Sequence, residues 1–163
     1  MDKCLVLGCG NRRDSSLINA VYLDIDPDCK PDVVHDLTKH PLPFKDEEFN
    51  KIYAVHVLEH LAYQGDVEFF FREFEEYWRI LKPEGRFIGV CPLAGTKWAW
   101  GDPGHRRVIQ KETLLFLDRD MYNQVGVTTM GDYRYLYKKG NFKVVDYQEQ
   151  NGNSVFTLIK RRV

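Results

Sequence analysis

The chain has no paired cysteines, no long apolar run and almost no net charge. Its four cysteines form no Cys-x-x-Cys pair, so neither a disulfide framework nor a zinc knuckle is expected. No stretch approaches the roughly 20 apolar residues that a membrane-spanning helix needs, and the N-terminus reads as a strand rather than a signal peptide. With 23 basic and 24 acidic side chains, the composition requires no nucleic acid or membrane partner. These absences favour a cytoplasmic globular protein.

Short β-branched runs alternate with longer amphipathic stretches, a pattern typical of a parallel sheet covered by helices. Strands are predicted at 3–7, 21–23, 32–35, 51–56, 86–91, 142–147 and 154–159. A long helix is predicted over 66–81, where apolar residues recur at three- and four-residue intervals, and a short one over 110–117. A loop is predicted from 92 to 107, and the segment 122–139 shows no clear pattern.

The predicted fold is one doubly wound, mostly parallel, Rossmann-like α/β domain over residues 1–163, with an antiparallel C-terminal hairpin turning at 150–153. Its first crossover is unusually short. Only ten residues separate Gly10 from Val21, whereas a crossover between parallel strands normally takes a dozen or more. This connection can hold a turn or two of helix at most. We therefore expect another segment or a second subunit, as in a homodimer, to cover that face of the sheet.

A glycine-rich turn, Gly8-Cys9-Gly10, directly follows the first predicted strand, and the second strand ends in Asp24. Glycines let the backbone approach a ligand closely. A carboxylate at the end of the next strand can accept hydrogen bonds from both hydroxyls of a ribose. This pair of features predicts a nucleotide-type cofactor site. An ordinary turn is the alternative explanation of each feature taken alone.

Seven motifs occur in order and at compact spacing, and together they resemble the class I S-adenosylmethionine-dependent methyltransferases, specifically the small type 11 group. They are Leu5–Gly10, Tyr22–Pro27, Val34–Leu37, Pro41–Phe44, Phe49–Ile52, His56–Leu61 and Arg79–Gly85. In the last motif Glu84 stands where the family usually has glycine. A nicotinamide-binding fold is the rival, but its fingerprint needs a third glycine where Arg13 stands.

The resemblance implies that the protein is a transferase that uses S-adenosylmethionine. The residues that it assigns to the cofactor are Leu7, Gly8, Cys9, Gly10 and Asn11 around the methionine part, Asp24 on the ribose, Ile25, Asp36 and Leu37 on the adenine, and His56 beside the methionine. Asp36 also fits a plain helix cap.

Methyl transfer needs positioning and, for a protonated acceptor atom, a base. His56 and His105 are the predicted catalytic residues, because a histidine titrates near neutral pH. The acceptor is expected to be a small molecule bound by the loop that contains His105. The tryptophans of this loop, Trp98 and Trp100, either stack on the acceptor or fill the core, and its arginines are expected to meet an anion.

Two alternatives remain open. His56, Glu59 and His60, together with His105, resemble the Glu-x-x-Glu-His…His metal site of small-RNA 2′-O-methyltransferases, with His56 in place of the first glutamate. Leu-Glu-His also occurs in type 11 enzymes without metal dependence, so no metal is expected. The other alternative is a non-catalytic cofactor-binding scaffold whose basic residues contact a nucleic acid or an acidic partner.

Overall fold

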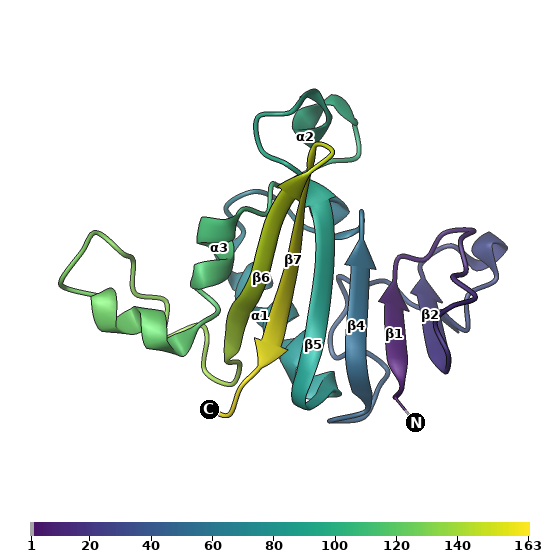
Figure 1. Ribbon diagram of the computed structural model, residues 1–163, viewed down its shortest axis with the longest axis horizontal. Helices are drawn as coiled ribbons and strands as arrows, with labels where there is room; N and C mark the ends of the chain where they lie inside the picture. Colours follow the sequence, from purple (N-terminus) through teal and green to yellow (C-terminus); the bar gives the residue numbers. More distant parts are fainter. Residues whose placement is uncertain (1) are drawn as a thin grey trace.

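The computed structural model describes residues 2–163, which form one seven-stranded sheet (Figure 1). The strands are β1 (Cys4–Leu7), β2 (Ala20–Asp24), β3 (Val33–Val34), β4 (Phe49–Val55), β5 (Leu81–Pro92), β6 (Phe142–Gln150) and β7 (Asn153–Lys160). Their order across the sheet is β3-β2-β1-β4-β5-β7-β6. Only β7 runs against its neighbours. The predicted α/β fold with an antiparallel C-terminal edge is confirmed.

The long helix α1 (Val67–Ile80) packs behind the sheet in Figure 1. It begins where predicted, because the carboxylate of Asp66 accepts a hydrogen bond from the Phe69 amide at 3.0 Å and so caps the first turn. Its aromatic stripe lies on β5: the rings of Phe74 and Tyr77 lie 5.6 and 4.9 Å from the ring of Phe87. This face of the sheet forms the main hydrophobic core.

A buried ion pair joins α1 to the segment that follows His105. The Arg107 guanidinium donates to both carboxylate oxygens of Glu73, at 2.7 and 3.0 Å, and to the Leu58 carbonyl at 2.7 Å. Burial raises the pKa of Glu73, and the neighbouring guanidinium opposes that rise. Arg107 is thus bound to Glu73 inside the protein, so the prediction that it meets an anionic acceptor is wrong.

The opposite face of the sheet has no helical cover from residues 2–163 (Figure 1). Residues 11–19, between β1 and β2, contain no helix, which agrees with the prediction from their short length. Arg13 closes part of this face, because its guanidinium lies 4.6 Å from the Tyr22 ring and donates to the Lys30 carbonyl at 2.7 Å. The remaining strands on this face stay open.

The largest differences from the predicted elements lie in β5, in the loop after it and in β3. Strand β5 begins at Leu81 rather than at 86, because Leu81 pairs with Phe49 before a bulge that places Glu84 in the left-handed region at φ 60°. A short helix, α2 (Lys97–Gly101), lies within the predicted loop. Strand β3 spans two residues instead of four.

The other helices are short. They are η1 (Pro27–Cys29), η2 (Leu58–His60), α3 (Lys111–Leu115) and η3 (Arg119–Gln124). The last one lies at the start of the segment that showed no sequence pattern. None of the helices in residues 2–163 is long and apolar enough to cross a membrane.

Candidate functional site

The glycine turn after β1 has two residues in the left-handed region, Gly8 at φ 58° and Gly10 at φ 51°. A side chain at Gly8 would lie 2.5 Å from a methyl group of Val57, so this glycine lets the turn approach the segment after β4. Apart from Gly10 and its two chain neighbours, a side chain at Gly10 would meet no atom of residues 2–163 within 4 Å. The turn therefore presents open space at Gly10, as a cofactor site requires.

Asp24 joins the glycine turn to the end of β2. Its carboxylate accepts from the Gly10 amide at 2.7 Å through one oxygen and from the Asp26 amide at 3.0 Å through the other. A carboxylate has about four acceptor positions, so two remain for a ligand. The next side chain, Ile25, is 63% exposed. The residues at the end of β2 thus fit a ribose and a flat base.

Asp36 forms a local turn after β3. One of its oxygens accepts from the Thr38 amide at 2.8 Å and from the Thr38 hydroxyl at 2.7 Å. These hydrogen bonds lower the pKa of Asp36. Residues 37–48, which directly follow it, contain no helix, so Asp36 is not a helix cap. The side chain of Leu37 packs into the core, which leaves its backbone as the group that a ligand could contact.

His56 follows the last residue of β4 and adopts a left-handed conformation at φ 53°. Its amide donates to the Val90 carbonyl at 2.9 Å, which ties it to β5. Its Nδ1 lies 3.2 Å from Oε1 of Glu59. This hydrogen bond raises the pKa of His56, against the effects of burial and of Arg12. The imidazole thus lies at the carboxyl edge of the sheet, as predicted.

A cleft of about 380 Å³ opens at the carboxyl ends of β4 and β5 and contains His56 and His105, which lie 49 positions apart. Its lining comprises His56, Glu59, His60, Pro92, Thr96, Trp98, Asp102, His105, Asn151, Gly152 and Asn153. His105 Nδ1 donates to the Trp98 carbonyl at 2.8 Å; since a carbonyl only accepts, Nε2 of the neutral ring keeps a free lone pair.

The tryptophans of the His105 loop do not fill the core. Trp98 is 61% exposed and Trp100 is 58% exposed, whereas Ala99 between them is buried. Trp98 lines the cleft. Of the two explanations left open by the sequence, core filling is wrong.

The β6–β7 turn provides one wall of the cleft, which was not predicted from the sequence. Residues 151–153 lie there because Asn153 pairs with Pro92, the last residue of β5. The signal was present: a hairpin partner that runs antiparallel to β5 must turn at the carboxyl edge of the sheet.

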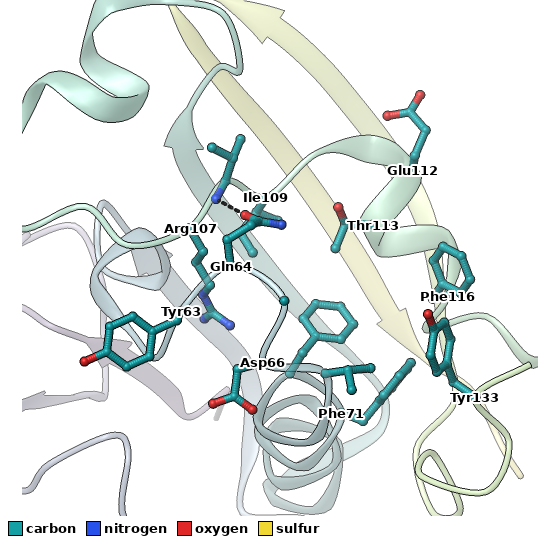
Figure 2. A pocket seen from close by; sticks show the side chains of 14 residues that line it. Tyr63, Gln64, Asp66, Phe71, Arg107, Ile109, Glu112, Thr113, Phe116 and Tyr133 are labelled. Atoms are coloured by element: carbon teal, nitrogen blue, oxygen red, sulfur yellow. Dashed lines mark hydrogen bonds between the residues drawn. The ribbon is translucent and has the colours of Figure 1, made fainter. Parts of the chain in front are cut away.

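A second cavity, of about 440 Å³, lies between the N-terminus of α1 and α3 (Figure 2). The ring of Tyr133 lies 5.5 Å from the rings of both Phe71 and Phe116, and the Gln64 side chain accepts from the Val108 amide at 2.8 Å. This cavity contains none of the predicted cofactor or catalytic residues.

The fold and the carboxyl-edge site define a nucleotide-cofactor-binding α/β protein. The model of the family described as "Methyltransferase domain" matches residues 5–89, just over half of the chain. The chain belongs to this family and is an S-adenosylmethionine-dependent methyltransferase. The predicted family and enzyme class are confirmed.

Solved structures agree on the fold. An S-adenosylmethionine-dependent methyltransferase from Archaeoglobus fulgidus is 16% identical, with a TM-score of 0.64 over 98% of this chain and 86% of that chain. One from Methanosarcina mazei is 15% identical, with a TM-score of 0.63 over 99% of this chain and 93% of that chain. The N-methyltransferase NodS from Bradyrhizobium japonicum, in complex with S-adenosylhomocysteine, is 14% identical, with a TM-score of 0.61 over 98% and 78%. A search of curated protein sequences found no match.

Proposed function

We propose that this protein, as one catalytic domain, transfers the methyl group of S-adenosylmethionine to a small molecule bound in the cleft beyond β4 and β5. The observation on which this depends is the position of that cleft. Its residue His56 follows β4, the strand next to β1 and the glycine turn. At about 380 Å³, the cleft has the size of a small-ligand site.

The residues proposed to hold the cofactor are Leu7, Gly8, Cys9, Gly10, Asn11, Asp24, Ile25, Asp36, Leu37 and His56. Support comes from the open space at Gly10, the free acceptor positions of Asp24 and the exposed Ile25 side chain. When bound, S-adenosylmethionine supplies an electrophilic methyl group at a sulfonium centre.

The protein contributes orientation and proton acceptance in this proposal. The side chain of His105 is only 8% exposed, so its free Nε2 is shielded from competing water. His56 donates through Nδ1 to Glu59, which also leaves Nε2 of its neutral form free. Either imidazole is placed to take a proton from an acceptor oxygen or nitrogen.

Calorimetric titration of the full chain with S-adenosylhomocysteine tests the cofactor residues. We expect Asp24→Ala to weaken binding about 100-fold, because two hydrogen bonds to a charged group are lost. The control Asp28→Ala removes a nearby exposed carboxylate from the η1 turn and should bind normally. NADH should give no heat. Equal affinity of Asp24→Ala and the unmodified protein would contradict the assignment.

A screen of small-molecule acceptors, in which the release of S-adenosylhomocysteine is measured, tests the catalytic residues. We expect His105→Ala to abolish turnover while calorimetry shows unchanged cofactor affinity. His35→Ala is the control, because His35 directly follows β3 and does not line the cleft. Unchanged turnover by His105→Ala would contradict its role. Cofactor binding without methyl release across the screen would favour the non-catalytic scaffold.

A small molecule is favoured over nucleic acid because several basic side chains already contact other groups of the same chain. Lys160 is buried and donates to the Leu81 carbonyl at 2.7 Å. Arg161 pairs with Asp120 at 2.7 Å, and Arg107 is buried against Glu73. These contacts interrupt the basic runs seen in the sequence. A cytoplasmic location stays a prediction.

A second copy of the chain is the proposed cover for the open face of the sheet. The registers place Val6, Tyr53 and Ile88 in one row across three strands, with Val90 and Val155 paired beside them. In a twofold dimer the same patch of both copies meets across the axis, so one apolar face can cover the other. Light scattering during size-exclusion chromatography should give the mass of a dimer; a monomer at high concentration would contradict the proposal.

A further inference from the structure

Three potential metal ligands converge in the acceptor cleft. Glu59 and His60 lie in η2, and His105 lies in the loop after α2. One ligand atom from each of these residues lies within 4.8 Å of the other two. His56, which the sequence grouped with them, contacts Glu59 from the side and is not part of this set.

Both imidazoles are oriented by backbone carbonyls. His60 Nδ1 lies 3.1 Å from the Gly104 carbonyl, and His105 Nδ1 lies 2.8 Å from the Trp98 carbonyl. Each Nδ1 must therefore be the protonated nitrogen, and each Nε2 of the neutral ring has a free lone pair. A carbonyl that fixes the tautomer and the ring in this way is the usual outer partner of a metal-binding histidine.

Glu59 supplies the negative charge of the cluster. The residue is 1% exposed. Its Oε1 accepts from His56 Nδ1 at 3.2 Å and lies 3.9 Å from His105 Nε2, whereas its Oε2 has no hydrogen-bond partner in the described chain. A buried carboxylate oxygen without a partner is destabilising. A cation bound at this position would offset that cost.

We propose that Glu59, His60 and His105 bind one divalent transition-metal ion, with zinc as the best match. Two imidazole nitrogens and one carboxylate, with a further position open, form a familiar zinc donor set, whereas magnesium prefers oxygen ligands. Tetrahedral zinc with bonds of about 2.0–2.2 Å separates its ligands by about 3.4 Å. Glu59 Oε1 and His105 Nε2 lie 3.9 Å apart, and all three ligand atoms lie within 4.8 Å of one another, so the cluster must contract on binding the ion.

Such a metal would change the role of His105 in the proposed function. Its Nε2 lone pair would bind the ion instead of taking a proton, and His56 would remain as the proton acceptor. The open position faces a cleft in which Asp102 Oδ2 also lies 3.9 Å from His105 Nε2. An acceptor oxygen or a water fits that position. Metal binding itself does not depend on methyl transfer.

The test is calorimetric titration of the untagged, chelator-treated full chain with zinc chloride and, separately, magnesium chloride. We expect one zinc ion per chain and at least about 100-fold weaker binding of magnesium. His60→Ala and His105→Ala should each weaken zinc binding at least about 100-fold, which exceeds the usual effect of losing an outer partner. His35→Ala, a histidine outside the cluster, should bind zinc normally. Glu59→Gln, which keeps the side-chain size, should weaken binding at least about 10-fold.

Cobalt substitution gives a second measurement that does not depend on activity. The d–d bands of tetrahedral cobalt should appear in the unmodified protein and vanish in His60→Ala, whose exposed position makes misfolding a poor explanation. Retained S-adenosylhomocysteine affinity in the same variant shows that the cofactor site is intact. The proposal is overturned if zinc does not bind, if His60→Ala binds zinc like the unmodified protein, or if the cobalt spectrum shows thiolate charge transfer from the cysteines.

Discussion

The two faces of the sheet differ in cover although the same strands build both. Phe87 and Phe156 point toward α1 and are fully buried, whereas their neighbours Ile88 and Thr157 point the other way and remain partly exposed. Both faces carry large apolar side chains, so hydrophobicity alone does not account for the difference.

The lengths of the connections account for it. The 25 residues between β4 and β5 include the 14-residue helix α1, whereas the connection between β1 and β2 is too short for a helix that could cover the sheet. The contrast shows that the crossover, rather than the strand, decides which face becomes core.

The largest effect is expected on the covered face. Phe87→Ala should lower the free energy of unfolding by about 3–5 kcal/mol, because it leaves a cavity among aromatic rings. Ile88→Ala, one residue further on and facing the open side, should cost less than half as much. Urea denaturation at low protein concentration measures both variants. Equal losses would show that the open face is as well packed as the covered one.

A smaller effect is expected from added volume on the covered face. A Cβ at Gly89 would lie 2.1 Å from the ring of Phe156, so Gly89→Ala should lower the free energy of unfolding by about 1–3 kcal/mol. Gly101→Ala is the control, since its Cβ would make only an ordinary contact of 3.9 Å with Trp98. It should change stability by less than about 0.5 kcal/mol. Thermal unfolding followed by circular dichroism compares the two; a stable Gly89→Ala variant would mean that the Phe156 ring moves freely.

The sequence predicted the parts of the fold that depend on local patterns. The helix predicted over 66–81 is observed as Val67–Ile80, because its cap and its apolar stripe lie within one segment. The contact between the glycine turn and Asp24 followed from topology, since neighbouring parallel strands end at the same edge. The short helix α2 was missed, because the many glycine, proline and tryptophan residues around it favoured a loop.

The acceptor cleft was only partly predictable. His56 and His105 were singled out by residue type and position, but their link through Glu59 depends on how the loop after α2 returns to η2. The buried contact of Arg107 with Glu73 fixes that return, and nothing in the local sequence distinguishes this arginine from its exposed neighbour Arg106. Long-range pairing of charged residues therefore set the limit of the sequence analysis.

A charged substitution on the open face should change the association of two copies rather than the stability of the fold. Ile88→Lys should convert the proposed dimer to a monomer, because it places a charge within the apolar row, while the unfolding free energy of the monomer changes by less than about 1 kcal/mol. Asn123→Lys, an exposed position in η3, is the control and should leave the mass unchanged. Light scattering during size-exclusion chromatography distinguishes them. A dimer that survives Ile88→Lys would show that the copies associate through another surface.

The smallest effect concerns a histidine packed against the helix of the covered face. His40 stacks on Phe69 at 5.7 Å, and neither of its buried ring nitrogens has a hydrogen-bond partner in the described chain. Burial lowers the pKa of His40 from its usual 6.5, with Arg72 acting in the same direction and Glu76 opposing. Well above pH 6.5 the ring is neutral in both the folded and the unfolded chain.

As the pH falls below 6.5, the unfolded chain takes up a proton that folded His40 resists, so the unfolding free energy declines until the pH passes the lowered pKa of the folded state. His40→Phe should remove this part of the acid destabilisation and keep the ring stacking. Urea denaturation at pH about 7.5 and about 5.5 measures the change for both proteins. If the two lose the same stability over that interval, His40 is protonated as readily in the folded protein as in the unfolded chain, and the helix-covered side of the sheet is more open to water near Phe69 than its packing indicates.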